Sequence, residues 1–183
     1  MRMVFGDFSL FLRAEGKFGM IEKLELPELK WKSEEYNGGG QMGTREIGLI
    51  LDKLEMKLSS NSYDRPMLSR AMQAPGQQEQ WKVMGSMIVP GEDEKPFKVL
   101  VTGALMELKR GEMQPGKKTD TDFVIKDITY YQEFLDGTEL YEVDLLNQVL
   151  RVNGIDQMAT RRRNLAAEAA GDAPIVARPS RAA

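Results

Sequence analysis

The stretch that decides the fold is residues 130–143, which reads YYQEFLDGTELYEV. Asp136-Gly137 separates two runs that are rich in aromatic and apolar residues. Because Asp-Gly supplies the positive φ values that a type I′ turn requires, this stretch predicts a β-hairpin. Antiparallel strands are therefore expected to dominate the fold.

Apolar and polar residues alternate with a period of two in segments that precede this hairpin. Residues 23–26 read KLEL and residues 54–58 read LEMKL, so apolar side chains fall on one strand face and charged ones on the other. Residues 97–108 and 123–134 are apolar on both faces, which predicts central strands covered on both sides. Two further predicted strands are 30–32, which continues the first run beyond Pro27, and 81–89.

One internal helix is predicted among these strands. Ser62 is its expected cap, Pro66 falls in its first turn, and Pro75-Gly76 ends it. Its apolar face consists of Met67, Leu68, Ala71 and Met72. A single helix among about seven strands predicts a mainly β fold, a sandwich or a barrel, because the crossover helices of a parallel α/β fold are missing.

Composition narrows the function further. The 183 residues fit one domain. With 28 carboxylates against 25 Lys plus Arg, the chain lacks the cationic excess of a generic nucleic-acid binder. It contains no Cys and no His, which excludes disulfides, thiolate metal sites and Ser-His-Asp or Cys-His catalysis. No apolar run reaches the ~20 residues of a membrane span, and no signal peptide is evident, so synthesis and retention in a cytoplasm before assembly are expected.

Three short motifs resemble cofactor or metal sites but lack the required context. Residues 38–43 satisfy G-x-G-x-x-G without a buried strand before them or a helix after them. Residues 111–117 approach a phosphate-binding loop, but Lys118 stands where Ser or Thr is needed. Asp120 and Asp122 have calcium-loop spacing without the Gly and Glu that such a loop requires. No cofactor and no metal are therefore predicted, and residues 37–43, 90–96 and 111–121 are expected to be loops.

Several segments of the chain have the same order and similar spacing as segments of a known protein family. They are Leu26-Pro27, Glu35 to Gly40, Glu46-Ile47-Gly48, Val101 to Lys109, Pro115-Gly116-Lys117-Lys118, Tyr141 to Asp144 and Val152 to Asp156. Together they resemble the major tail tube proteins of contractile-tailed bacteriophages. The resemblance implies a two-sheet β-sandwich or barrel of the tail tube type, with one flanking helix and a short C-terminal helix through Arg163.

The same resemblance implies a structural subunit and not an enzyme. Homohexameric rings would stack into the inner tube of a contractile tail, in the virion, and DNA would pass through without specific binding. The implied partners are other copies of the chain, the tail sheath protein, the tape-measure protein and baseplate or terminator proteins, with no membrane. Residues 1–167 would form the tube domain, and residues 168–183 a flexible extension.

Candidate interface residues follow from loops that could join copies. The expected inter-subunit or ring-stacking loops contain Glu34, Glu35, Tyr36, Gly38, Gly39, Gly40, Met42, Gly111, Pro115, Lys117 and Lys118. The expected C-terminal interface contains Asn153, Gly154, Asp156, Arg161, Arg162 and Arg163. We also expect the Arg161–Arg163 cluster to pair with Glu34-Glu35 of a neighbouring copy, and the Lys, Glu and Thr positions of 98–108 and 121–133 to line the lumen.

Three alternatives remain open at this point. The first is a tube subunit of a phage-tail-like bacteriocin or of a bacterial contractile injection or secretion system. The second is a small β-barrel enzyme that uses Asp120, Asp122 and Glu133, which would have to converge in one pocket. The third is a monomeric carbohydrate- or peptide-binding sandwich, which would show an exposed aromatic cluster, whereas the aromatics other than Trp31 and Trp81 mostly fall in strand patterns.

Overall fold

A computed structural model of the chain describes residues 3–171 except 14, 18, 37–41, 43–44 and 117. These residues form twelve strands in two sheets and two helices, so the predicted mainly β fold is confirmed. The strands are β1 (Val4–Leu12), β2 (Glu15–Lys17), β3 (Ile21–Glu25), β4 (Trp31–Tyr36), β5 (Arg45–Leu51), β6 (Met56–Ser60), β7 (Glu79–Ile88), β8 (Lys95–Arg110), β9 (Thr121–Leu135), β10 (Thr138–Asp144), β11 (Val149–Val152) and β12 (Ile155–Asp156). The helices are α1 (Arg65–Leu68) and α2 (Ala159–Gly171).

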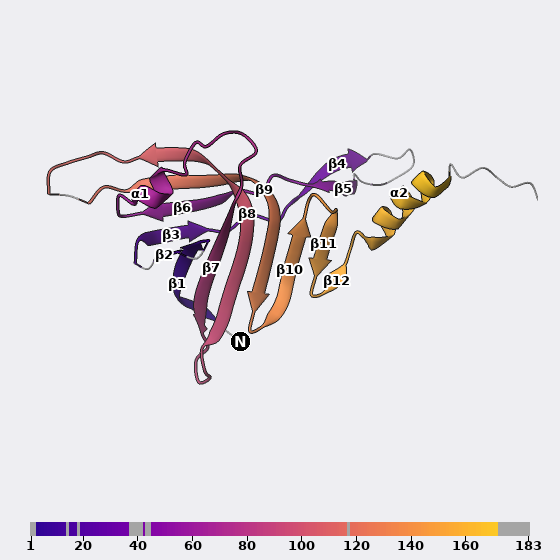
Figure 1. Cartoon of the computed structure of the whole chain (residues 1–183). Coiled ribbons are helices and arrows are strands. Elements are labelled where there is room, and N and C mark those ends of the chain that lie inside the picture. Colours follow the sequence, from indigo (N-terminus) through magenta and orange to yellow (C-terminus); the bar gives the residue numbers. More distant parts are fainter. Residues whose placement is uncertain are drawn as a thin grey trace, which may run out of the picture.

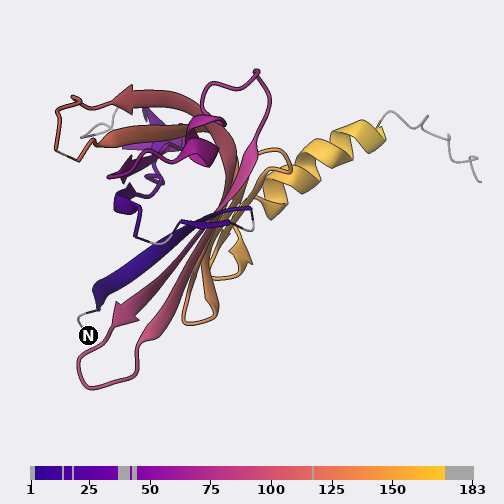
Figure 2. The ribbon, with the colours of Figure 1, turned by 60° about the vertical axis from the view of Figure 1, so that its left-hand side comes forward.

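The long β8–β9 hairpin is the centre of the fold, and it bends midway along its length (Figure 2). At the bend the register passes from Thr102 opposite Tyr130 to Ala104 opposite Lys126. Three residues of β9, 127–129, therefore lie opposite a single residue of β8, Gly103. Such a bulge bends a strand pair and increases its twist. Glycine is required at position 103 because an added Cβ would lie 2.9 Å from Ile128 Cγ1.

This bend folds the ten-stranded sheet into two layers (Figure 1). The large layer has the strand order β12-β11-β10-β9-β8-β7-β1-β2. In the second layer, β6 pairs with the first half of β9 and β3 pairs with β6. One strand pair therefore belongs to both layers of the sandwich.

The core lies between the two layers. Every second residue of β8 from Phe97 to Leu105 is buried, and the indole of Trp81 donates a hydrogen bond of 3.3 Å to the carbonyl of Gly103 at the bend. The opposite face of β8 is half-exposed at Lys98, Leu100 and Thr102. The prediction that 97–108 is covered on both faces is therefore wrong. The largest fully buried side chains are Trp81, Tyr131, Phe123, Leu10, Leu12, Met56, Leu58, Met67 and Ile125.

The internal helix is shorter than the sequence pattern predicts. Met67 is buried and Pro66 lies in the first turn, as expected, but α1 ends at Leu68. Met72 is 72% exposed with a φ of 60°, so it leaves the predicted apolar face. Asp64 and not Ser62 occupies the N-cap position. Its carboxylate lies 2.9 Å from Lys17 Nζ in a buried ion pair, which ties the helix to β2.

Two strand predictions also need correction. Residues 30–32 do not continue the 23–26 strand, because residues 26–30 form no strand and β4 starts a separate sheet with β5. Val4–Leu12 forms a long strand paired with β7, although no strand was predicted there. The Asp136-Gly137 hairpin is confirmed, with φ values of 52° and 74°.

Candidate assembly interface

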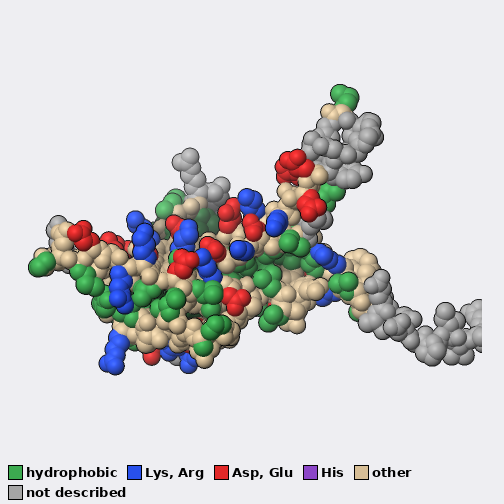
Figure 3. Space-filling view, turned by 90° about the horizontal axis from the view of Figure 1, so that it is seen from above, with side chains coloured by type: hydrophobic (Ala, Val, Ile, Leu, Met, Phe, Trp, Pro, Cys, Tyr) green, Lys and Arg blue, Asp and Glu red, His purple; other side chains and the backbone are tan. Residues whose placement is uncertain are grey.

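The β4–β5 hairpin is an arm that projects from the body (Figures 1 and 3). Its two strands pair only with each other among the described residues. Leu51 packs against the core at its base, and Asp52 N donates to the carbonyl of Lys30 over 2.7 Å. Farther out, Ile47 and Ile50 are 47% and 53% exposed. The arm therefore has an apolar face that the other described residues leave uncovered, although an isolated two-stranded hairpin is only marginally stable in water.

Four residues of the first predicted stacking loop are described, and three of them belong to β4 of this arm. Glu34 and Glu35 are exposed on β4, and Met42 is fully exposed. Tyr36 is the last residue of β4. Gly38, Gly39 and Gly40 lie outside the described residues.

The second predicted loop, residues 111–121, corresponds to residues 111–120 between β8 and β9, and in Figure 1 it extends from the side of the molecule opposite to the arm. Gly111 N donates to the carbonyl of Asp120 over 2.8 Å, so the loop leaves the body as a narrow tongue. Gly111, Pro115 and Lys118 are exposed, while Lys117 lies outside the described residues. A strand follows this loop and not a helix, which agrees with a turn and not with a phosphate-binding site.

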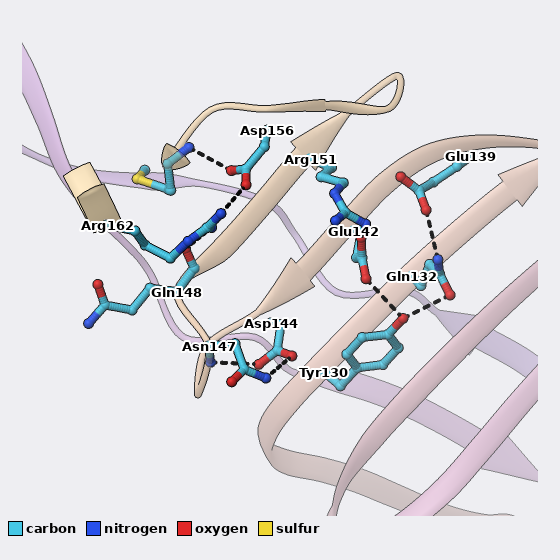
Figure 4. A network of polar contacts seen from close by, with 11 residues as sticks. Tyr130, Gln132, Glu139, Glu142, Asp144, Asn147, Gln148, Arg151, Asp156 and Arg162 are labelled. Carbon is cyan, nitrogen blue, oxygen red and sulfur yellow. Dashed lines mark hydrogen bonds and ion pairs between the residues drawn. The ribbon is translucent and has the colours of Figure 1, made fainter. Parts of the chain in front are cut away.

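Two of the predicted C-terminal residues, Asp156 and Arg162, are held in a folded corner (Figure 4). Asp156 accepts hydrogen bonds from Met158 N over 2.9 Å and from Arg162 Nη2 over 2.5 Å. The second bond is the main cause of a lowered pKa of the Asp156 carboxyl. Arg162 also donates to the carbonyl of Gln148 over 2.9 Å. These contacts fix the start of α2, which runs to Gly171 and so extends past its predicted end at Arg163.

Asn153-Gly154, another predicted interface pair, is the turn between β11 and β12. The φ values are 50° and 78°, as a type I′ turn requires. Asn153 N also donates to the carbonyl of Leu140 over 2.9 Å. Both residues are exposed. This second hairpin was not predicted, although Asn-Gly is the strongest short signal for one.

A polar network covers the outer face of the large layer near β10 (Figure 4). Glu142 pairs with Arg151 over 2.5 Å, and the Tyr130 hydroxyl lies 3.3 Å from the same carboxylate. Gln132 donates to Glu139 over 2.8 Å. Burial and, next, the Glu142 charge raise the pKa of Tyr130 to about 12. Tyr130 therefore stays a neutral hydrogen-bonding group. The network has a structural role, because it links side chains of β9, β10 and β11.

The positions predicted to line the lumen do not share one face. Lys98 pairs across the hairpin with Phe134, whereas Glu133 pairs with buried Val99 and so lies on the core side, where it accepts a 2.7 Å hydrogen bond from Tyr131. Thr121 is 1% exposed. These two positions therefore cannot join Lys98 and Thr102 on the outer face of the large layer.

The carboxylates of the enzyme alternative do not converge. Asp122 lies near the start of β9 and accepts a 2.8 Å hydrogen bond from Ser59, whereas Glu133 lies near the other end of that strand. Asp120 lies in the loop before β9. Among the described residues, no group of three or more acidic side chains is placed to hold a metal ion. Neither helix of the described chain has the length and apolar character that crossing a bilayer requires.

Several strand edges remain open within the described part of the chain. The outer edge of β1 is paired with β2 only at Leu10 to Leu12, so Val4 to Ser9 pair with β7 on one edge and with no described strand on the other. At the other end of the large layer, β12 pairs only with β11. Val4 and Phe5 on the open β1 edge are 57% and 42% exposed. Open edges of this kind pair with other chains unless they are covered.

An apolar groove of ≈ 340 Å³ lies between the base of the arm, the β10–β11 turn and α2. Trp31 and Ile50 line it from the arm, Leu145 and Val149 from the turn, and Met158 and Leu165 from the C-terminal segment. Trp31 is held in place because its side chain packs on Gly48, where an added Cβ would lie 2.9 Å from Trp31 Cβ. This groove was not predicted from the sequence.

Open sheet edges, an unpartnered arm and polar groups already engaged within the chain define a structural subunit that assembles with other chains. Comparison with known proteins gives the family. The profile of the family described as Phage tail tube protein FII matches residues 4–165, so the chain belongs to this family. It is a phage tail tube protein, a structural part of the virion tail, which confirms the resemblance.

Two curated phage relatives agree with this assignment. The chain is 29% identical to the tail tube protein of Escherichia phage P2 over 161 residues, which cover 86% of this chain and 93% of that protein. It is 27% identical to the major tail tube protein of Serratia phage KSP20, over 80% of this chain and 85% of that protein. A solved structure, described as the PVC sheath/tube terminator of an extracellular contractile injection system in the extended state, matches with 8% identity and a TM-score of 0.48, over 70% of this chain and 91% of that one.

Proposed function

We propose that this tube protein forms hexameric rings that stack into the inner tube of a contractile tail and provide a conduit for DNA. The observation that carries the proposal is the pair of open edges at the two ends of the large layer, β1 at one end and β12 at the other. Two different edges on one subunit give a head-to-tail contact, which closes into a ring when the rotation allows it. A second head-to-tail contact along the axis extends the tube.

The interface residues predicted from the sequence remain part of this proposal. The arm, with Glu34 and Glu35 near its tip, and the β8–β9 loop project from the body and are available to neighbours. The proposed pairing joins Glu34-Glu35 to the C-terminal arginine cluster of the next copy, Arg161 to Arg163, in which Arg162 also binds Asp156 of its own chain. In this proposal, residues 1–167 form the tube domain and residues 168–183 its extension.

The remaining partners follow from the place of a tube inside a tail. The tube surface contacts the sheath protein, its ends contact baseplate and terminator proteins, and its lumen holds the tape-measure protein before DNA. The half-exposed face of Lys98 and Thr102 is the proposed lumen face. The net charge of −3 disfavours tight binding to phosphate, so DNA passes without specific contacts.

We infer an assembly role in place of a catalytic one. The family is structural, and the candidate acids Asp122 and Glu133 are separated along β9, where each already accepts a hydrogen bond. A reactive pair would need two acids in one site with separated pKa values.

Negative-stain electron microscopy of the purified protein, combined with light scattering, tests the proposal. We expect rings with sixfold symmetry and tubes that lengthen with protein concentration. A deletion of residues 3–6, which removes part of the open β1 edge, should leave folded single copies. Wild-type protein that remains monomeric at high concentration would overturn the proposal.

A further inference from the structure

The groove between the arm and α2 lies at the surface and is lined mainly by apolar side chains. Its apolar lining is exposed, with Ile50 at 53%, Leu145 at 46% and Leu165 at 52%. Figure 3 shows the arm and α2 leaving the body in different directions, so the space between them opens outward. Exposed apolar surface rimmed by polar groups marks an interaction site.

The groove has room for a long apolar side chain. An apolar cavity of about 150 Å³ can hold a benzene molecule, and this groove measures ≈ 340 Å³. Its walls come from the arm, which is distant in sequence, and from the β10–β11 turn and α2. An occupant would therefore hold the arm and α2 in one arrangement.

The β8–β9 loop carries a side chain of the required kind. Met113 lies in this loop and is 60% exposed. Methionine is flexible and fills irregular apolar gaps well. The hydrogen bond from Gly111 N to the Asp120 carbonyl closes the loop at its base, which gives it the shape of an insert.

The positions of the loop and the groove suit a contact between copies. In Figures 1 and 2 the β8–β9 loop extends from one side of the molecule, and α2 leaves from the opposite side. A chain cannot bring its own loop across the body into its own groove. Two complementary surfaces on opposite sides of one subunit generate a head-to-tail contact that repeats from copy to copy.

We propose that the β8–β9 loop of one copy inserts Met113 into the groove between the arm and α2 of the next copy. This inference rests on the proposed ring and tube assembly, and it names the loop and the groove that meet in it. Arg161 and Asp144 both line the groove, and the loop presents the exposed carboxylates of Glu112 and Asp120 and the exposed ammonium group of Lys118. Opposite charges at the rim favour this orientation of the contact.

The open β1 edge is the main competitor for the groove, and it fits less well. Phe5 already packs against Phe8 and Phe97, with ring centroids 6.2 Å and 5.3 Å apart. The backbone of Val4 to Ser9 needs a strand as its partner, because it offers a row of unpaired N–H and C=O groups. An apolar groove cannot satisfy those groups.

Engineered disulfides test the contact directly, because the chain has no natural cysteine. The test pairs are Met113→Cys with Leu165→Cys and Met113→Cys with Leu145→Cys, all at exposed positions. Bridged residues must have Cα atoms within about 7 Å. On oxidation of assembled protein, we expect a ladder of covalent oligomers on a non-reducing gel from at least one pair. The matched control combines Met113→Cys with Ile88→Cys, which is 43% exposed on β7 and should give no ladder.

Each outcome separates this inference from the proposed function. Tubes that give no ladder with either groove pair, or a ladder only with the Ile88 control, overturn the loop-in-groove contact and leave tube assembly standing. Unassembled wild-type protein overturns both. Two substitutions of Met113 give an independent test. Met113→Leu should form tubes as the wild type does, whereas Met113→Asp should form shorter tubes or none. The circular dichroism spectrum of Met113→Asp should be the same as that of the wild type.

Discussion

The β8–β9 hairpin and the β4–β5 arm are both antiparallel strand pairs, but they differ in what surrounds them. Along β8 and β9, alternate residues are buried between two layers, and other strands pair along most of the outer edges. The arm pairs with no other described strand, and its isoleucines are about half exposed. The body is thus covered by its own chain, whereas the arm keeps an exposed apolar face within the described part of the chain. Four changes test this contrast, ordered by their expected effect on the stability of the single subunit.

Phe123→Ala should have the largest effect. Phe123 is 0% exposed on β9, in the half that pairs with both β6 and β8. Removing a buried aromatic ring costs about 3–5 kcal/mol of unfolding free energy, from lost burial and from the cavity that remains. Urea unfolding of dilute, unassembled protein measures it. Met106→Ala, at a 47% exposed position on β8, is the control and should change the unfolding free energy by about 0.5 kcal/mol or less.

Gly103→Ala should have an intermediate effect. The added Cβ would lie 2.9 Å from Ile128 Cγ1, 3.0 Å from Ile125 Cγ2 and 3.1 Å from the Lys126 carbonyl oxygen. Overpacking of this kind costs about 1–3 kcal/mol. The neighbouring change Ala104→Gly removes a Cβ methyl group where Gly103→Ala adds one, and it should lower the unfolding free energy by about 0.5–1 kcal/mol. Equal urea midpoints for Gly103→Ala and the wild type would show that the bend does not require glycine.

Acid should weaken the corner that positions α2. The pKa of Asp156 is lowered below its ordinary value of 3.8, chiefly by its hydrogen bond with Arg162. A carboxyl with a depressed pKa in the folded state stabilises at pH values above its unfolded pKa, and this contribution is lost as the pH falls through the folded pKa. When the pH is lowered below about 4, the melting temperature of the wild type should therefore decrease more than that of Asp156→Asn. Parallel curves for the two proteins would show that the pair contributes nothing to stability.

Replacing Ile47 and Ile50 together by serine should have the smallest effect on the subunit. Both side chains are exposed in the single chain, so the unfolding free energy should change by about 0.5 kcal/mol or less. Tube formation should nevertheless be lost, because the arm loses the apolar face that a neighbour covers. Urea unfolding and electron microscopy of the same sample provide the two measurements. Lys32→Ser, on the same arm, is the control that should still form tubes, and a large loss of stability in the double variant would place the arm in the body's cooperative unit.

The local features of the fold could largely be predicted from the sequence. Asp136-Gly137 encodes a hairpin in two residues. Alternation at 54–58, the apolar face of 81–89 and the apolar runs at 97–108 and 123–134 predicted β6 to β9 within a few residues of their observed bounds. The bend could not be predicted, because the three bulged residues and Gly103 show no periodic pattern before the strand register is known. The break after β3 was missed for a related reason: the two-residue period continues through residues 30–32 although the chain changes sheet at that point.

The candidate interface was only partly accessible from the sequence. Glycine and proline marked the loops at 37–43 and 111–121 as connections, and that required no knowledge of packing. The groove could not be found in this way, because Trp31, Leu145 and Leu165 come together only through the three-dimensional arrangement. The arginine cluster was predicted as one unit, whereas the folded chain assigns Arg162 to Asp156 because the turn before α2 brings the two together.

The shared hairpin also has a mechanical consequence. Since β8 and β9 pass without interruption from one layer to the other, a pull on the β8–β9 loop is transmitted along covalent backbone to the opposite layer. Two layers joined only by side-chain packing would slide under shear, but here sliding would require the ladder of hydrogen bonds between the two strands to break. Each subunit should therefore behave as a stiff element when axial or torsional force acts on the tail.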